Sequence, residues 1–150
     1  MIELVHLQRQ FQSIKQDVLE QVAEVLDSGA YILGPHVKAF EAEAAEYIGV
    51  KHAIGTANGT DALVLTLDAL GIGPGDEVIT TPFTFFASAE AISRVGAKPV
   101  FVDVDPRHYN LDISELKAAI TPATKAIIPV HLFGQPADMQ ELMNIADEHR

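Results

Sequence analysis

From His52 onward the sequence alternates between short apolar runs and amphipathic stretches, and this alternation restricts the possible folds more than any other feature. Near-continuous apolar runs, such as Pro-Val-Phe-Val-Asp-Val at 99–104, are typical of strands buried on both faces of a sheet. Helices between such strands cover both faces of a mostly parallel sheet. We therefore expect an α/β fold with a mostly parallel central sheet and helices on both faces. Ligands of such a sheet bind at the carboxyl ends of its strands.

Two helices precede the alternation and are joined by an apolar loop, Ala-Tyr-Ile-Leu-Gly-Pro at 30–35. An exposed apolar loop indicates a contact surface, although a buried connection is equally consistent with the pattern. We divide the chain into residues 1–35, an N-terminal helix with its loop, and residues 36–150. The expected helices span 8–28, 36–48, 60–70, 85–95, 112–120 and 137–149, and the expected strands span 52–56, 77–81, 99–104 and 125–131.

Composition excludes several classes of function. The chain has 150 residues and no cysteine, so disulfides, thiolate metal sites and cysteine nucleophiles are excluded together. Ten basic residues against 21 acidic ones give a net charge of −11, which makes nucleic acid an unsuitable partner. No apolar run approaches the roughly 20 residues of a membrane helix. The first residues lack the basic segment and cleavage site of a signal peptide, so we expect a cytoplasmic protein.

The turn at 55–61, Gly-Thr-Ala-Asn-Gly-Thr-Asp, lies between an expected strand and an expected helix. Gly59 lacks a Cβ, so its backbone can take strained angles and a ligand can come close. Thr60 and Asp61 can cap the helix, and the free N–H groups at a helix start attract an anion such as a phosphate. The turn alone equally describes an ordinary capped helix after a strand, which is the commoner case.

The ends of the other expected strands carry side chains of types that bind ligands or take part in catalysis. Aromatic rings beside an anion site suit a flat, phosphorylated heterocycle. Each group also has a structural interpretation: aromatic rings as core, aspartates as turn caps in place of metal ligands, and the histidine as a structural side chain. We expect no metal site. The residues in question are Phe83, Phe85, Phe86, Asp103, Asp105 and His131.

A series of motifs across the chain resembles one family. They are Gly-Ala-Tyr-Ile-Leu-Gly-Pro at 29–35, Thr-Ala-Asn-Gly-Thr-Asp-Ala-Leu at 56–63, Gly-Pro-Gly-Asp-Glu-Val-Ile at 73–79, Pro-Phe-Thr-Phe-Phe-Ala-Ser at 82–88, Phe-Val-Asp-Val-Asp at 101–105 and Pro-Val-His-Leu-Phe-Gly-Gln-Pro-Ala-Asp-Met at 129–139. Their order and spacing resemble the pyridoxal-phosphate-dependent nucleotide-sugar aminotransferases of the DegT/DnrJ type, which are fold-type I transferases.

The resemblance implies a role for each matching position. Gly59, Thr60 and Asp61 would hold the phosphate of pyridoxal 5′-phosphate, and Phe85 would stack on its ring. His131 would lie close to the cofactor, in a role that the resemblance does not assign. The loop residues Tyr31, Ile32 and Leu33 would line the site for the nucleotide-sugar, at the interface of a homodimer.

One pair of family residues has no counterpart here. The family has a lysine that holds the cofactor covalently and an aspartate that pairs with the ring nitrogen, both after the last helix of this chain. We therefore expect residues 36–150 to be the first part of the cofactor-binding large domain of a protein at least about twice as long. The parent would transfer an amino group from an amino acid, expected to be glutamate, to a nucleotide-linked keto-sugar, and the segment alone would be inactive.

Two alternatives stay open at this stage. Some members of the family are sugar dehydratases, in which a histidine replaces the lysine, so the residue at that position decides between the two reactions. A truncated homologue that only binds a phosphorylated ligand or a partner chain is the other alternative.

Overall fold

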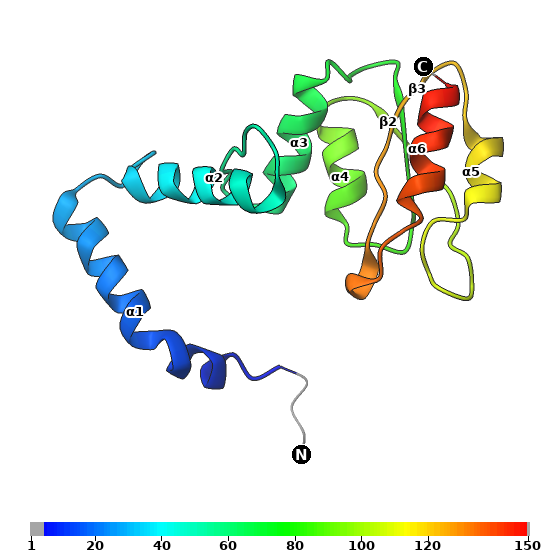
Figure 1. Ribbon diagram of the computed structural model, residues 1–150. Helices are drawn as coiled ribbons and strands as arrows, with labels where there is room; N and C mark the ends of the chain where they lie inside the picture. Colours follow the sequence, from blue (N-terminus) through cyan, green and yellow to red (C-terminus); the bar gives the residue numbers. More distant parts are fainter. Residues whose placement is uncertain (1–4, 150) are drawn as a thin grey trace. The chain divides into compact units, whose positions relative to one another are not determined.

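The computed structural model describes residues 5–149 and confirms the expected α/β architecture. Its sheet consists of β1 (Glu77–Thr80), β2 (Lys98–Phe101) and β3 (Thr124–Ile127), in the order β2-β1-β3. All three strands are parallel, with Ile79 opposite Val100 on one side and Ile127 on the other. Because β1 is the middle strand, the loops that follow β1 and β3 leave the same edge of the sheet side by side (Figure 1).

The helices occupy most of the positions that the sequence predicts. Between Val5 and His149, no helix is both long and apolar enough to cross a membrane. The helices are α1 (Leu7–Ser28), α2 (Pro35–Ile48), α3 (Gly59–Ala69), α4 (Ala87–Arg94), α5 (Ile113–Ala119) and α6 (Met139–Glu148), with a short 3-10 helix, η1, at Leu132–Gly134.

Neighbouring residues of β1 point to opposite faces of the sheet and build two separate cores. Val78 packs with Leu67 of α3 and Ile92 of α4, whereas Ile79 packs in a second cluster with Leu116 of α5. Ile145 of α6 completes that second cluster. Helices α3 and α4 therefore cover one face, and α5 and α6 cover the other (Figure 1).

The chain forms two compact units, Met1–Gly55 and Thr56–Arg150. The first contains α1 and α2, which are followed by Gly29 and Gly49 in the left-handed conformation that favours glycine. Helix α1 has no buried residue, and most of its apolar side chains are exposed within the described chain. The division expected at residue 35 is a functional one, which these two structural units do not test, and it stays a prediction.

The strand expected at 52–56 does not form. These residues have no strand conformation, and the Ile54 side chain is 83% exposed. An apolar run predicts a strand, but a strand also requires a hydrogen-bonded neighbour. Both sides of β1 are already paired, and within residues 5–149 no other strand pairs with 52–56.

Candidate functional site

Asn58 caps the start of α3 and leaves two amides unbonded. Its Oδ1 accepts a hydrogen bond from the Asp61 N–H at 2.9 Å, so the expectation that Thr60 or Asp61 would be the cap is wrong. The N–H groups of Gly59 and Thr60 precede the first intrahelical bond, which Ala62 donates to the Asn58 carbonyl. In the described part of the chain neither amide has an acceptor, so both are available to an anion.

Gly59 contributes open space and no backbone strain. It is the first residue of α3 and has no positive φ, so the expectation of strained angles is wrong. A Cβ built on Gly59 meets no atom within 4 Å. The approach to the two free amides is therefore open.

The Asp61 carboxylate is engaged within the protein. Its Oδ2 accepts from Asn58 Nδ2 at 2.9 Å, and its Oδ1 lies 3.9 Å from Nη1 of Arg94 in α4. These donors offset the negative charge beside the free amides. The predicted contribution of Asp61 to phosphate binding stays a prediction, with its own N–H already bonded to Asn58.

The aromatic residues after β1 are exposed rather than part of the core. Phe85 and Phe86 are 76% and 73% exposed, and Phe83 tilts against Tyr109 with ring centroids 5.9 Å apart. A hydrogen bond between Thr84 Oγ1 and Ser88 Oγ, 2.9 Å apart, links the loop to the first turn of α4. The Phe85 ring therefore offers a free face at the carboxyl edge of the sheet.

His131 follows β3 at the same edge, in a turn rather than at the end of a strand. The strand ends at Ile127, four residues earlier than expected. The ring Nδ1 accepts a hydrogen bond from the Ala137 N–H at 3.0 Å. An accepting Nδ1 carries no proton, so the neutral ring has its proton on Nε2.

The start of α3, Phe85 and His131 all belong to elements around the same sheet, but they make no direct contact with one another. Phe85 and His131 follow the adjacent strands β1 and β3, and α3 packs on α4 through Leu67 and Ile92 (Figure 1). Within the described residues, no hydrogen bond, ion pair or ring contact joins the start of α3 to Phe85 or His131.

The apolar loop of the first unit is exposed. Tyr31, Ile32 and Leu33 are 65%, 87% and 69% exposed, and Leu33 has a φ of 49°, which is uncommon for a residue with a branched side chain. The Tyr31 hydroxyl donates to the Leu26 carbonyl at 3.2 Å. Their role in substrate binding stays a prediction.

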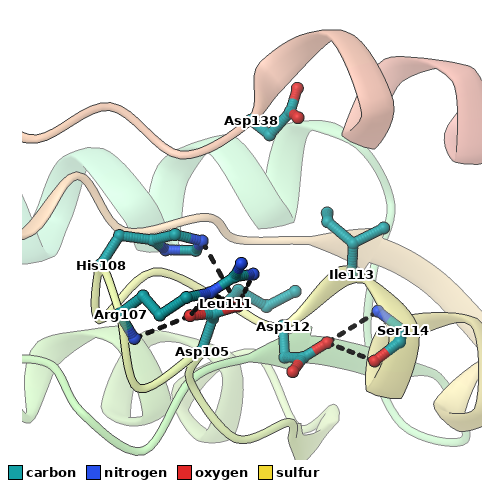
Figure 2. Close-up of a pocket in the computed structure, with 8 residues that line it drawn as sticks. All are labelled: Asp105, Arg107, His108, Leu111, Asp112, Ile113, Ser114 and Asp138. Carbon is teal, nitrogen blue, oxygen red and sulfur yellow. Dashed lines mark hydrogen bonds and ion pairs between the residues drawn. The ribbon is translucent and has the colours of Figure 1, made fainter.

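A pocket of about 450 Å³ lies beside the start of α5 (Figure 2). It contains none of the predicted cofactor or substrate residues. Asp105 binds Arg107 there, with Oδ2 and Nη2 2.6 Å apart, and Asp112 caps α5 through the Ser114 N–H. Asp103 accepts from the Val104 N–H, so both candidate metal ligands serve as turn carboxylates, and no metal-binding cluster occurs among residues 5–149.

We predict that Asp105→Asn lowers the stability of the fold at neutral pH and makes it less dependent on pH in acid. Hydrogen bonds from the Arg107 side chain and backbone hold the pKa of the Asp105 carboxyl well below its usual range. The ionised form therefore stabilises the fold above about pH 3.9, and this contribution is lost as pH falls from there towards the folded pKa. Urea denaturation should show a lower free energy of unfolding for Asp105→Asn at neutral pH, with the difference from wild type shrinking below about pH 3.9. Asp68→Asn is the matched control, and an equal effect of both variants would refute the prediction.

Comparison with known proteins decides the family. Residues 12–150 match the model of the DegT/DnrJ/EryC1/StrS aminotransferase family. The chain belongs to this aminotransferase family. A relative in Acidithiobacillus ferrooxidans, a UDP-N-acetyl-3-dehydro-alpha-D-glucosamine 3-aminotransferase, is 53% identical over 148 residues, which cover 99% of this chain and 40% of the relative.

Solved structures of aminotransferases share the fold of this segment. DesV of Streptomyces venezuelae, solved in complex with a ketimine intermediate, superposes with a TM-score of 0.96 at 46% identity, over 99% of this chain and 40% of that one. NtdA of Bacillus subtilis, with bound PMP, superposes with a TM-score of 0.89 at 39% identity, over 91% of this chain and 32% of NtdA. The chain thus spans about 40% of the length of its curated relative and of DesV.

The sequence did not indicate Asn110, whose side chain reaches from the loop after β2 to the turn that carries His131. Its side chain bonds to two carbonyls 25 and 26 residues further along the chain. A contact between such distant residues leaves no periodic signal. The only local sign is the polarity of Asn110 between apolar neighbours, Tyr109 and Leu111.

Proposed function

We propose that Gly59, Thr60, Phe85 and His131 form one part of a pyridoxal 5′-phosphate site in an aminotransferase. The observation that carries this proposal is the pair of unbonded amides at the open start of α3, an 11-residue helix. Such a helix start binds a phosphate through its N–H groups and its positive dipole end. The family match and the PMP-bound relative support the identity of the ligand.

Each residue would contribute a distinct interaction. The amides of Gly59 and Thr60 bind the phosphate, and the Thr60 hydroxyl adds a third donor on the same turn. The exposed Phe85 ring holds a flat heterocycle by stacking, and His131 offers its Nε2–H as a donor. The cofactor, when bound, supplies the electron sink that amino-group transfer requires.

We propose that the parent protein transfers an amino group from an amino acid, with glutamate as the expected donor, to a nucleotide-linked keto-sugar. Support comes from the relative that acts on a UDP-linked sugar. Tyr31, Ile32 and Leu33 would contact that sugar substrate, since they are apolar and exposed. A homodimer would cover the exposed apolar side chains of α1, such as Leu19.

The positions of the lysines in the second unit support the proposal that none of them is the catalytic base. Lys98 begins β2 and Lys125 is the second residue of β3, so both lie at the amino edge, opposite Phe85 and His131. Lys117 binds Glu141 with 3.3 Å between Nζ and Oε1. We propose that residues 1–150 alone do not catalyse transamination; turnover in a coupled keto-sugar assay would contradict this.

Binding of pyridoxamine 5′-phosphate tests the proposed site. This form of the cofactor has no aldehyde, so it cannot react with surface lysines. Calorimetric titration of the 150-residue chain should show at least about tenfold tighter binding of pyridoxamine 5′-phosphate than of pyridoxamine, which corresponds to about 1.4 kcal/mol for the phosphate. Equal affinities would remove the start of α3 from the site.

Phe85→Ala separates the ring contact from the phosphate contact. Loss of stacking, worth about 0.5–1.5 kcal/mol, should weaken binding of both pyridoxamine 5′-phosphate and pyridoxamine by about two- to twelvefold. The ratio of the two affinities should not change, because the amides of α3 stay in place. Phe86→Ala removes an equally exposed neighbouring ring and should leave both affinities at the wild-type level. The same loss in both variants would contradict a specific role for Phe85.

A further inference from the structure

Asn110 is a buried polar side chain that joins two loops at the carboxyl edge of the sheet. Its side chain and backbone together are 3% exposed, and its Nδ2 donates to the carbonyls of Gln135 at 3.3 Å and Pro136 at 2.8 Å. The Asn110 carbonyl accepts from the Asp105 N–H at 2.9 Å. Asn110 is thus anchored to the loop after β2 and holds the turn after β3.

The two carbonyls that Asn110 holds immediately precede the donor to His131. Gln135 and Pro136 lead directly into Ala137, whose N–H bonds to His131 Nδ1 at 3.0 Å. A displacement of the 135–136 segment would carry the Ala137 N–H away from the imidazole. The hydrogen bond to His131 Nδ1 thus comes from the residue directly after the segment that Asn110 holds.

Backbone strain on both sides of this contact shows that the arrangement is enforced. Tyr109, next to Asn110, has a φ of 58°, and Phe133, two residues after His131, has a φ of 55°. Aromatic residues rarely adopt this conformation, which persists only where surrounding contacts hold it. The Asn110 and His131 hydrogen bonds are such contacts.

We propose that Asn110 is a positioning residue for His131. It fixes the turn so that His131 keeps its Ala137 hydrogen bond and offers a preorganised Nε2–H donor at the carboxyl edge. This inference rests on the proposed function in one respect, because a fixed donor is of use where a ligand binds at that edge. The hydrogen-bond geometry itself is measurable without the cofactor.

The test is the nitrogen–nitrogen coupling across the Ala137 N–H···Nδ1 His131 hydrogen bond, recorded by NMR on the ¹⁵N-labelled 150-residue chain. Wild type should show the coupling, and His131→Gln identifies it by its disappearance. Asn110→Ala should abolish the coupling and speed hydrogen exchange of the Ala137 amide at least about tenfold. The amides of Val78 and Ile79 should keep their protection, which shows that the sheet is intact. Asn144→Ala, an exposed amide on α6, is the control and should retain the coupling.

Three results would overturn the proposal: no coupling in wild type, coupling retained in Asn110→Ala, or coupling lost together with the protection of Val78 and Ile79. The last would show that Asn110 supports the whole fold rather than the His131 turn. None of these results depends on cofactor binding, so the failure of this inference is distinguishable from the failure of the proposed function.

Discussion

Thr60→Glu should weaken binding of pyridoxamine 5′-phosphate by at least about tenfold without loss of folding stability, a change of about 1.4 kcal/mol or more in binding free energy. Thr60 is the second residue of α3, and its amide is one of the two that have no acceptor within the described chain. A carboxylate at this position competes with the phosphate for the amides and repels it. The same carboxylate favours the helix, because a negative charge near a helix N-terminus stabilises it by about 0.3–1 kcal/mol.

Calorimetric titration and urea denaturation of the same protein samples measure the two effects separately. Thr66→Glu adds the same charge near the other end of α3, at an exposed residue, and serves as the control. It should bind pyridoxamine 5′-phosphate with nearly the wild-type affinity. A similar loss of affinity in both variants would mean that net charge matters and that the start of α3 does not.

Ile79→Ala should reduce the free energy required to open the sheet by about 2–5 kcal/mol. Ile79 is fully buried in the middle strand and packs in one cluster with Leu116 of α5 and Ile145 of α6. A loss of this size is a large part of the roughly 5–15 kcal/mol that stabilises a typical domain. Hydrogen exchange of the β1 and β3 amides measures it within the second unit alone.

The matched control for this change is Ile54→Ala. Ile54 is 83% exposed, so removal of the same atoms should change stability by less than about 0.5 kcal/mol. If Ile79→Ala left the exchange of the β1 amides unchanged, the middle strand would not be the centre of the core.

The architecture was predictable because it depends on local patterns. Apolar runs identified β1, β2 and β3, and helical periodicity identified α1 and α3, within a few residues at each end. The strand at 52–56 was wrong because an apolar run does not report whether a neighbour exists to pair with it. His131 was placed at a strand end for the same reason, since pairing stops at Ile127.

The candidate site was predictable only in part. The Gly-Thr pair after Asn58 has a local signature, the start of a helix after a polar turn, and the helix expected from residue 60 begins at Gly59. Phe85 and His131 followed from the expectation that parallel strands end at one edge. Asn110 and the Arg107 partner of Asp105 were missed, because side-chain hydrogen bonds depend on geometry that no residue pattern encodes.

The most direct test of the central claim is a titration of the ¹⁵N-labelled chain with pyridoxamine 5′-phosphate, followed through its amide resonances. We predict the largest shifts at the N–H groups of Gly59 and Thr60, and much smaller shifts there when pyridoxamine replaces the phosphorylated ligand. Largest shifts in the pocket around Asp105 and Asp112, or none at Gly59 and Thr60, would contradict the assignment of the start of α3 as the phosphate site.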